Sequence, residues 1–212
     1  MKKTLVIFTL TTAFFSGVCH AGRSQTDEQL INEMRATSSK LIKTLGKTLK
    51  STIQQEGPEA AIRVCETVAP NLVNEISKET GWKVSRVSLK VRNPLIGTPD
   101  SWERKHLLAL SKNQPNKNSS TELTIIEMIK IKEGTSIRYL EALPTAPLCL
   151  TCHGKPEHIP NKVAKTLDTI YPFDDAKGYE VGEIRGAISV SYTHLRAHET
   201  DSYLVCRLLL EK

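Results

Sequence analysis

The chain of 212 residues has few aromatic side chains, no long apolar run and little excess charge. Aromatic residues make up 5% of it, too few for the stacking surfaces that single-stranded nucleic acids bind, so no nucleic-acid partner is expected. No apolar run reaches the roughly 20 residues of a membrane-spanning helix, so no stable membrane span is expected. The formal charge of +6 is mild and typical of a solvated surface. The sequence also lacks a phosphate-binding loop, a glycine-rich dinucleotide turn and a zinc-protease motif.

What is present describes an ordinary globular protein. Apolar residues make up 39% of the chain and charged residues 25%, which excludes disordered and fibrous classes. The length is that of one domain, with enough chain to bury a core.

Residues 1–21 have the pattern of a secretory signal peptide. Lys2 and Lys3 precede an apolar stretch from Thr4 to Phe15, and small residues lead to a cleavage site after Ala21. Cleavage would remove two lysines and lower the formal charge from +6 to +4. A lipoprotein signal at Cys19 is a weaker interpretation, because bulky Val18 precedes it. We therefore expect an exported protein, periplasmic if its source is bacterial.

The sequence Cys149-Leu150-Thr151-Cys152-His153 is the attachment signature of c-type haem. In that chemistry Cys149 and Cys152 add to the two vinyl groups of the porphyrin, and His153 binds the iron. A redox dithiol is an alternative, but no thioredoxin-like strand and helix flank the motif. A zinc site would need a second ligand pair, which His158 alone does not supply. The predicted cofactor is one haem c per chain.

A second axial ligand of the iron has to come from upstream, because no Met follows Cys152. Met128 lies in a strand-like run and is interpreted as a core residue. His106 is expected at the surface. The candidates are Met34, Cys65, His106 and Met128.

Cys65 lies on the apolar side of a helix that Gly57-Pro58 introduces. Ala61, Ile62 and Val68 share that side at helical spacing. Two interpretations stay open for Cys65: a buried thiol that acts as a small hydrophobe, or a thiolate ligand of iron.

Periodicity and turn residues predict helices first and antiparallel strands later, which indicates an α+β domain. Pro70 is expected to break or kink the second helix, Asp100 with Glu103 to form a capping box, and Glu133-Gly134 to turn a hairpin. The expected helices are 25–56, 58–70, 70–81, one that Asp100 caps, and 161–170; the expected strands are 84–91, 122–131, 135–143 and 185–190, with a polar loop at 113–120.

Several stretches together resemble the PAS-like, periplasmic mono-haem c proteins catalogued as a domain of unknown function. The stretches are 61–65, 86–94, 99–103, 149–154, 178–179 and 182–190. The resemblance covers roughly residues 30–191 and implies a PAS-like antiparallel sheet with packed helices and a long N-terminal helix. It also implies that His153 is the proximal ligand of the iron and Cys65 the distal one. Related domains serve as extracytoplasmic sensor modules, which suggests sensing.

Three basic residues, Arg86, Lys90 and Arg92, could neutralise the haem propionates. Their alternation fits a solvated strand face equally well. Trp102 is expected to pack in the core.

The resemblance stops after Ser191, and residues 192–212 are interpreted as a non-native tail, a read-through artefact. His194 and His198 are spaced i, i+4 and could suggest a metal site, but the artefact interpretation assigns no function to them or to Cys206. The domain is accordingly predicted to be 22–191.

The leading functional prediction is a redox or small-ligand sensor without bond-making catalysis, in which a small gaseous ligand is one possibility. An electron-transfer cytochrome is the alternative. A peroxidase-like enzyme would need an open iron site and a distal acid or base, for which only His106 is available. The expected partner is a redox protein or a signalling protein, and the oligomeric state stays open, although the long N-terminal helix could mediate pairing.

Overall fold

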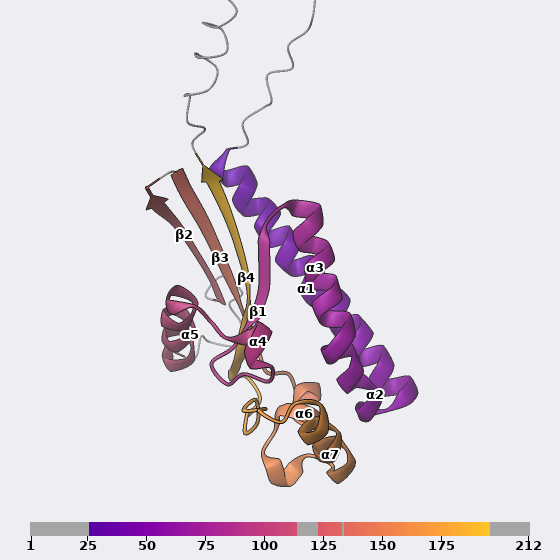
Figure 1. Cartoon of the computed structure of the whole chain (residues 1–212). Coiled ribbons are helices and arrows are strands. Elements are labelled where there is room, and N and C mark those ends of the chain that lie inside the picture. Colours follow the sequence, from indigo (N-terminus) through magenta and orange to yellow (C-terminus); the bar gives the residue numbers. More distant parts are fainter. Residues whose placement is uncertain (1–25, 114–122, 133, 196–212) are drawn as a thin grey trace, which may run out of the picture.

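The computed structural model describes residues 26–113, 123–132 and 134–195, so the predicted signal peptide, most of the 113–120 loop and residues 196–212 lie outside it. The fold is α+β, as predicted: a four-stranded antiparallel sheet of order β1-β4-β3-β2 with helices on both faces (Figure 1). That this sheet is PAS-like stays a prediction. The strands are β1 (Lys83–Val87), β2 (Thr124–Ile131), β3 (Gly134–Pro144) and β4 (Ile184–Leu195).

The long N-terminal helix α1 (Asp27–Glu56) begins at a capping box. The Thr26 hydroxyl accepts from the Gln29 amide, and the Gln29 side chain accepts from the Thr26 amide. Its apolar stripe, which includes fully buried Met34 and Leu41, packs on β3 and β4. In the described residues no helix is both long and apolar enough to cross a membrane.

One helical run follows α1 and returns along it, in three parts: α2 (Pro58–Arg63), the π-helical turn η1 (Val64–Val68) and α3 (Ala69–Thr80). Pro70 was expected to break or kink the helix, and the run is not broken there. Pro70 has no amide hydrogen to donate, and the turn before it widens, so that the Ala69 amide donates to the carbonyl oxygen of Val64. Gly81, with φ +71°, ends the run as predicted.

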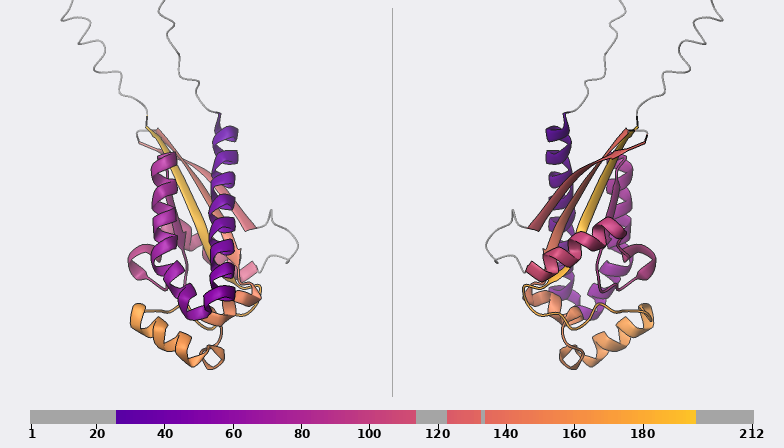
Figure 2. Two further views of the ribbon diagram at one scale, coloured as in Figure 1. Left: turned by 90° about the vertical axis from the view of Figure 1, so that its right-hand side faces the viewer. Right: turned by 90° about the vertical axis from the view of Figure 1, so that its left-hand side faces the viewer.

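The opposite face of the sheet is covered by α5 (Ser101–Asn113), as the two side views of Figure 2 show. Asp100 and Glu103 cap this helix reciprocally, as predicted. Trp102 packs against the core on this face, also as predicted. His106 was expected at the surface but is half-buried, because its ring lies against Trp102 with centroids 4.5 Å apart.

Strand β1 ends at Val87, four residues before its predicted end. The Ser88 amide donates to the carbonyl oxygen of Gly97, in the short helix α4 (Pro94–Gly97), and not to β4. The interpretation of Lys90 and Arg92 as part of a solvated strand face is therefore wrong, since both lie in the irregular segment after β1.

The predicted hairpin is confirmed by the pairing of β2 with β3. The interpretation of Met128 as a core residue is wrong, because 54% of it is exposed. It lies on β2, the edge strand, opposite Ile137, and α1 packs on β3 and β4.

The chain between β3 and β4 forms a small helical unit beyond one end of the sheet, coloured orange in Figure 1. Its elements are η3 (Pro147–Cys149), α6 (Leu150–His153), η4 (Pro156–His158) and α7 (Asn161–Ile170), the last as predicted. Helix α7 packs against α2 through a separate apolar cluster: Ile62, Ile159, Val163, Leu167 and Tyr171.

Strand β4 continues past its predicted end at Val190, because β3 pairs with it as far as Gly134 opposite Leu195. Tyr192 lies edge-on to Trp82, with ring centroids 6.3 Å apart. The proposed boundary at Ser191 stays a prediction, and residues 196–212 of the predicted tail are outside the described part.

Candidate functional site

The three motif residues share one short helical segment at the end of the sheet. Cys149 ends η3, and Cys152 and His153 lie in α6; both thiols are free. Gly154 ends the helix, and its amide donates to the Leu150 carbonyl oxygen over 2.9 Å. A Cβ atom at Gly154 would lie 2.6 Å from that same oxygen, so this turn requires glycine.

The ring of His153 is fixed by a carbonyl group from far along the chain. Its Nδ1 lies 2.7 Å from the carbonyl oxygen of Ala176. Since a carbonyl oxygen only accepts, Nδ1 carries the proton and donates. Nε2 therefore keeps its lone pair, the state in which histidine binds a metal. Burial and the charges of Arg185 and Arg92 hold the pKa of His153 well below its usual value, so the ring is neutral.

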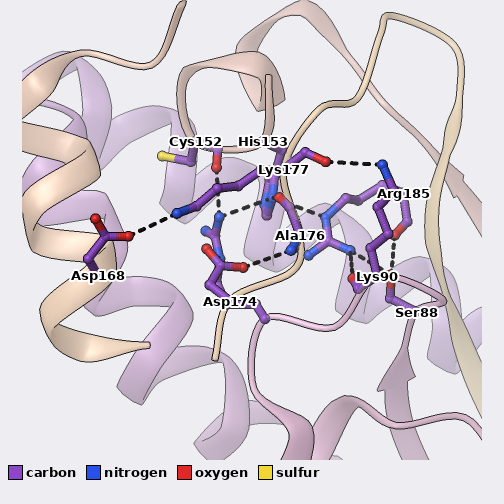
Figure 3. Close-up of polar contacts among 10 residues, drawn as sticks. Ser88, Lys90, Cys152, His153, Asp168, Asp174, Ala176, Lys177 and Arg185 are labelled. Atoms are coloured by element: carbon purple, nitrogen blue, oxygen red, sulfur yellow. Dashed lines mark hydrogen bonds and ion pairs between the residues drawn. The ribbon is translucent and has the colours of Figure 1, made fainter. Parts of the chain in front are cut away.

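Two arginines lie close to the same ring nitrogen, Nδ1 of His153. Nη2 of Arg92 and Nε of Arg185 each lie 3.2 Å from Nδ1 of His153. Figure 3 shows the ring directed toward Ala176 and Arg185. Nδ1 donates its proton to Ala176 and has no lone pair left to accept a bond, and a guanidinium group has no acceptor atom. The two contacts therefore place positive charge close to Nδ1 and are not hydrogen bonds.

Arg92 is buried, and its guanidinium binds groups of the protein itself. It donates to the carbonyl oxygen of Cys152 over 2.6 Å and pairs with Asp174 over 3.1 Å, between side chains that are 9% and 1% exposed. Asp174 also accepts from the Ala176 amide, over 2.9 Å. The pair thus ties the motif helix to the segment that presents the Ala176 carbonyl.

Arg185, the second residue of β4, is held by uncharged groups. Its Nη1 donates to the Ser88 hydroxyl over 2.8 Å and lies 3.3 Å from the Lys90 carbonyl oxygen, and its guanidinium faces the Tyr179 ring, 5.3 Å away. Burial lowers the pKa of Arg185.

The segment after Ala176 pairs with the backbone of the motif. The Tyr179 amide donates to the His153 carbonyl oxygen over 2.9 Å, and the Gly178 amide to that of Gly154 over 2.8 Å. Gly178 adopts φ +76°, which favours glycine. These bonds keep the Ala176 carbonyl opposite the histidine ring.

Cys65 lies on the π turn η1, half-buried, beside this site. Burial raises the pKa of the Cys152 thiol to about 11, and charge on Cys65 and Cys149 adds to the rise. Burial and charge on Cys65 likewise raise the pKa of Tyr171 to about 12. Cys65 is therefore close enough to both residues to act on them electrostatically, and Cys152 packs on the same apolar cluster as Ile62, one turn before Cys65.

The three basic residues that were predicted to contact the haem propionates lie in three different environments. Arg92 is the buried residue described above. Lys90 donates to the Lys177 carbonyl oxygen over 3.1 Å and lies 5.0 Å from the centroid of the Tyr179 ring. Arg86 is exposed on β1, opposite Ile188. Their contact with propionates stays a prediction.

The other ligand candidates lie outside this site. Met34 is fully buried between α1 and the sheet, His106 contacts Trp102 on α5, and Met128 is exposed on β2. Sequence reasoning missed Arg185, Asp174 and the Ala176 carbonyl, which no local spacing connects to the motif.

A pocket of about 400 Å³ lies beside α6. It is lined by Leu150, Thr151 and Gly154 of the motif segment, but by none of Cys149, Cys152 and His153. It therefore lies apart from the two thiols and the histidine ring.

The model of the family described as "Tll0287-like" matches residues 23–193. The chain therefore belongs to the Tll0287-like family. Among solved structures it is similar to the crystal structure of the cyanobacterial heme-protein Tll0287, with a TM-score of 0.61 and 21% sequence identity. The similarity covers 82% of this chain and 100% of that one, so the two share a fold. No curated protein matches the chain.

Proposed function

We propose that this chain is an exported c-type haem protein, with one haem attached through Cys149 and Cys152 and with His153 on the iron. The carrying observation is the 2.7 Å contact between His153 Nδ1 and the Ala176 carbonyl, which leaves Nε2 available to a metal. Membership of the Tll0287-like family supports it, since the related solved structure is that of a heme-protein. The haem would supply an iron centre that accepts and releases one electron.

The donor set fits this group better than the two alternatives. A redox dithiol of the thioredoxin kind opens a long helix directly after a strand, but Cys149 and Cys152 lie in the short helical segments η3 and α6. A structural zinc site needs four ligands, and within the described ranges no three His, Cys, Asp or Glu side chains gather at a possible metal site.

Cys65 is the proposed second axial ligand. It is half-buried on η1, one turn after Ile62, and Ile62 packs in the apolar cluster that Cys152 contacts. A thiolate is a strong anionic donor and favours ferric over ferrous iron.

The proposed role is a redox or small-ligand sensor. Cys65 lies within the π turn that joins α2 to α3, and α3 packs on α1 and β1. A change of bonding at the Cys65 sulfur would act on this helical run, which could carry it to a redox or signalling partner. A small gaseous ligand would have the same effect if it took the place of the Cys65 sulfur on the iron. An electron-transfer cytochrome is the second candidate, and it requires that Cys65 keep its bonding in both oxidation states.

Export to the periplasm through the signal peptide 1–21 completes the proposal. N-terminal sequencing of the chain recovered from a bacterial periplasm is expected to begin at Gly22. An intact Met1 on cytoplasmic protein would contradict export.

The test is a ferric-state EPR spectrum of the full chain matured with the c-haem attachment machinery. We expect a low-spin thiolate signal that Cys65→Ser abolishes and Thr67→Ser, a control on the same turn, preserves. A signal that Cys65→Ser leaves unchanged would contradict the Cys65 ligand and favour the carrier. Low-spin ferrous iron gives no EPR signal, so the absorption spectrum of the reduced protein separates the two roles. A five-coordinate ferrous spectrum supports the sensor, whereas six-coordinate spectra in both oxidation states support the carrier.

A further inference from the structure

We infer that Arg92 and Arg185 form a pair of positive charges that raises the reduction potential of the iron bound by His153. The inference rests on the proposed haem ligation and deepens it. It assigns to the two arginines a positioning and charge-setting role at the back of the histidine ring, 3.2 Å from Nδ1.

Neither arginine gains a hydrogen bond from the histidine. Nδ1 donates to the Ala176 carbonyl at 2.7 Å, so it has no lone pair to offer to a guanidinium. The two contacts therefore place positive charge against the edge of the ring that already carries a proton. Other groups of the protein hold the two guanidinium groups in this position.

The partners leave a net positive charge at the ring. Asp174 neutralises Arg92 through a buried ion pair. The acceptors of the Arg185 guanidinium within the described chain are the Ser88 hydroxyl and the Lys90 carbonyl, both uncharged. Two guanidinium groups thus face one carboxylate, in surroundings where burial weakens screening by water.

This charge opposes the effect of a thiolate ligand. Ferric iron carries one more positive charge than ferrous iron, so fixed cations nearby favour the ferrous state and raise the potential. A thiolate favours the ferric state and lowers it. The potential of the protein would then depend on the balance between Cys65 on one side and the arginine pair on the other.

The experiment is a spectroelectrochemical titration of the haem-loaded full chain and of four variants. We expect Arg185→Gln to lower the midpoint potential, so that the ferric-to-ferrous ratio at a fixed potential rises on the order of tenfold. Arg185→Lys keeps the charge and should retain most of the wild-type value. Arg104→Gln, which removes an exposed charge on α5, should leave the midpoint unchanged.

Asp174→Asn gives the opposite prediction, because it removes the negative partner of Arg92 and keeps an acceptor for the Ala176 amide. We expect it to raise the midpoint potential, and it carries the test if Arg185→Gln does not retain haem. A midpoint that Arg185→Gln leaves unchanged or raises, or that Asp174→Asn lowers, would overturn the inference. Absence of a haem spectrum in the wild-type chain would instead overturn the proposed function.

Discussion

The ring of His153 is fixed by one carbonyl group, from Ala176, and two guanidinium groups lie 3.2 Å from its Nδ1. The spacing Cys149-x-x-Cys152-His153 predicts which residues hold a haem, because the chemistry requires those types in that order. It does not predict the tautomer of the ring, which depends on a carbonyl group 23 residues further along the chain. It also does not predict Arg185, which lies 32 residues after His153 at the start of β4 and is held there by the Ser88 hydroxyl.

At Gly154 the absence of a side chain is a steric requirement. We expect Gly154→Ala to lower the free energy of unfolding by about 1–3 kcal/mol, because its Cβ would lie 2.6 Å from the Leu150 carbonyl oxygen. Gly46→Ala on α1 is the matched control. Nothing lies within 4 Å of its Cβ, so it should stabilise the helix by about 0.5–1 kcal/mol. Urea unfolding measures both, and equal effects would contradict the steric account.

The Cys152 thiol gives a prediction about pH. Its pKa is raised to about 11, mainly by burial, so its thiolate forms only as the pH approaches that value. In haem-free chain with Cys65→Ser and Cys149→Ser, burial, the largest cause of the raised pKa, is kept, so the rate of alkylation should keep rising above pH 9. The rate can be followed by mass spectrometry, and a plateau near pH 9 would contradict the buried environment.

Among the elements, those with a clear period were predictable and those set by distant partners were not. Helices α1 and α7 and the β2–β3 hairpin follow directly from apolar spacing and turn residues. Pro70 was expected to break or kink a helix, and the structure accommodates it by a π turn within a continuous helical run. Met128 has a strand-like sequence, yet its position on an edge strand leaves it exposed, and edge position is not encoded locally.

Helix α5 is joined to β3 by a partly buried ion-pair cluster. Arg138 pairs with Asp100 at 2.7 Å and with Glu103, 3% exposed, at 3.2 Å, and its guanidinium lies over Trp102. We expect Arg138→Ala to cost about 3 kcal/mol, because it leaves the Glu103 carboxylate buried without its cation.

The control for this prediction is Lys40→Ala, which breaks an ion pair whose side chains are 62% and 63% exposed. It should cost less than about 1 kcal/mol. Denaturant unfolding compares the two variants. A loss in Arg138→Ala no greater than in Lys40→Ala would contradict the structural role of the cluster.

At the scale of the whole molecule, the candidate site lies where three distant parts of the chain meet. The run α2–η1–α3 brings Cys65, the unit between β3 and β4 brings the motif, and the start of β4 brings Arg185. A sequence read locally identifies the first two through their residue types. It cannot bring them together, because the apolar contacts that join α2 to α7 connect Ile62 with Ile159 and Val163, about 100 residues further along the chain, and arise from helix packing.

The buried core on the α1 face predicts how stability depends on pH. Burial, with the charge of Glu141, raises the pKa of Tyr139 to about 12, so the neutral phenol is favoured in the folded state. The contribution of Tyr139 to the free energy of unfolding is fully present below pH 10, the usual pKa of a tyrosine, and is lost as the pH rises toward 12. We expect this tyrosine to cost about 1 kcal/mol of unfolding free energy between pH 9 and 11.

Unfolding of the wild-type chain and of Tyr139→Phe at pH 9 and pH 11 measures that contribution. The variant should lose less stability over the interval, and its remaining loss would include Tyr171, whose pKa is also raised to about 12. Identical losses in both proteins would contradict burial of an un-ionised phenol at the centre of the sheet.

The most direct test of the central claim is the mass of the denatured chain after maturation with the c-haem attachment machinery. Covalent attachment predicts an added mass of one haem that survives denaturation. It also predicts that the double variant Cys149→Ser, Cys152→Ser lacks this mass, while Cys65→Ser retains it. A wild-type chain that loses its haem on denaturation, or never gains it, would contradict the account.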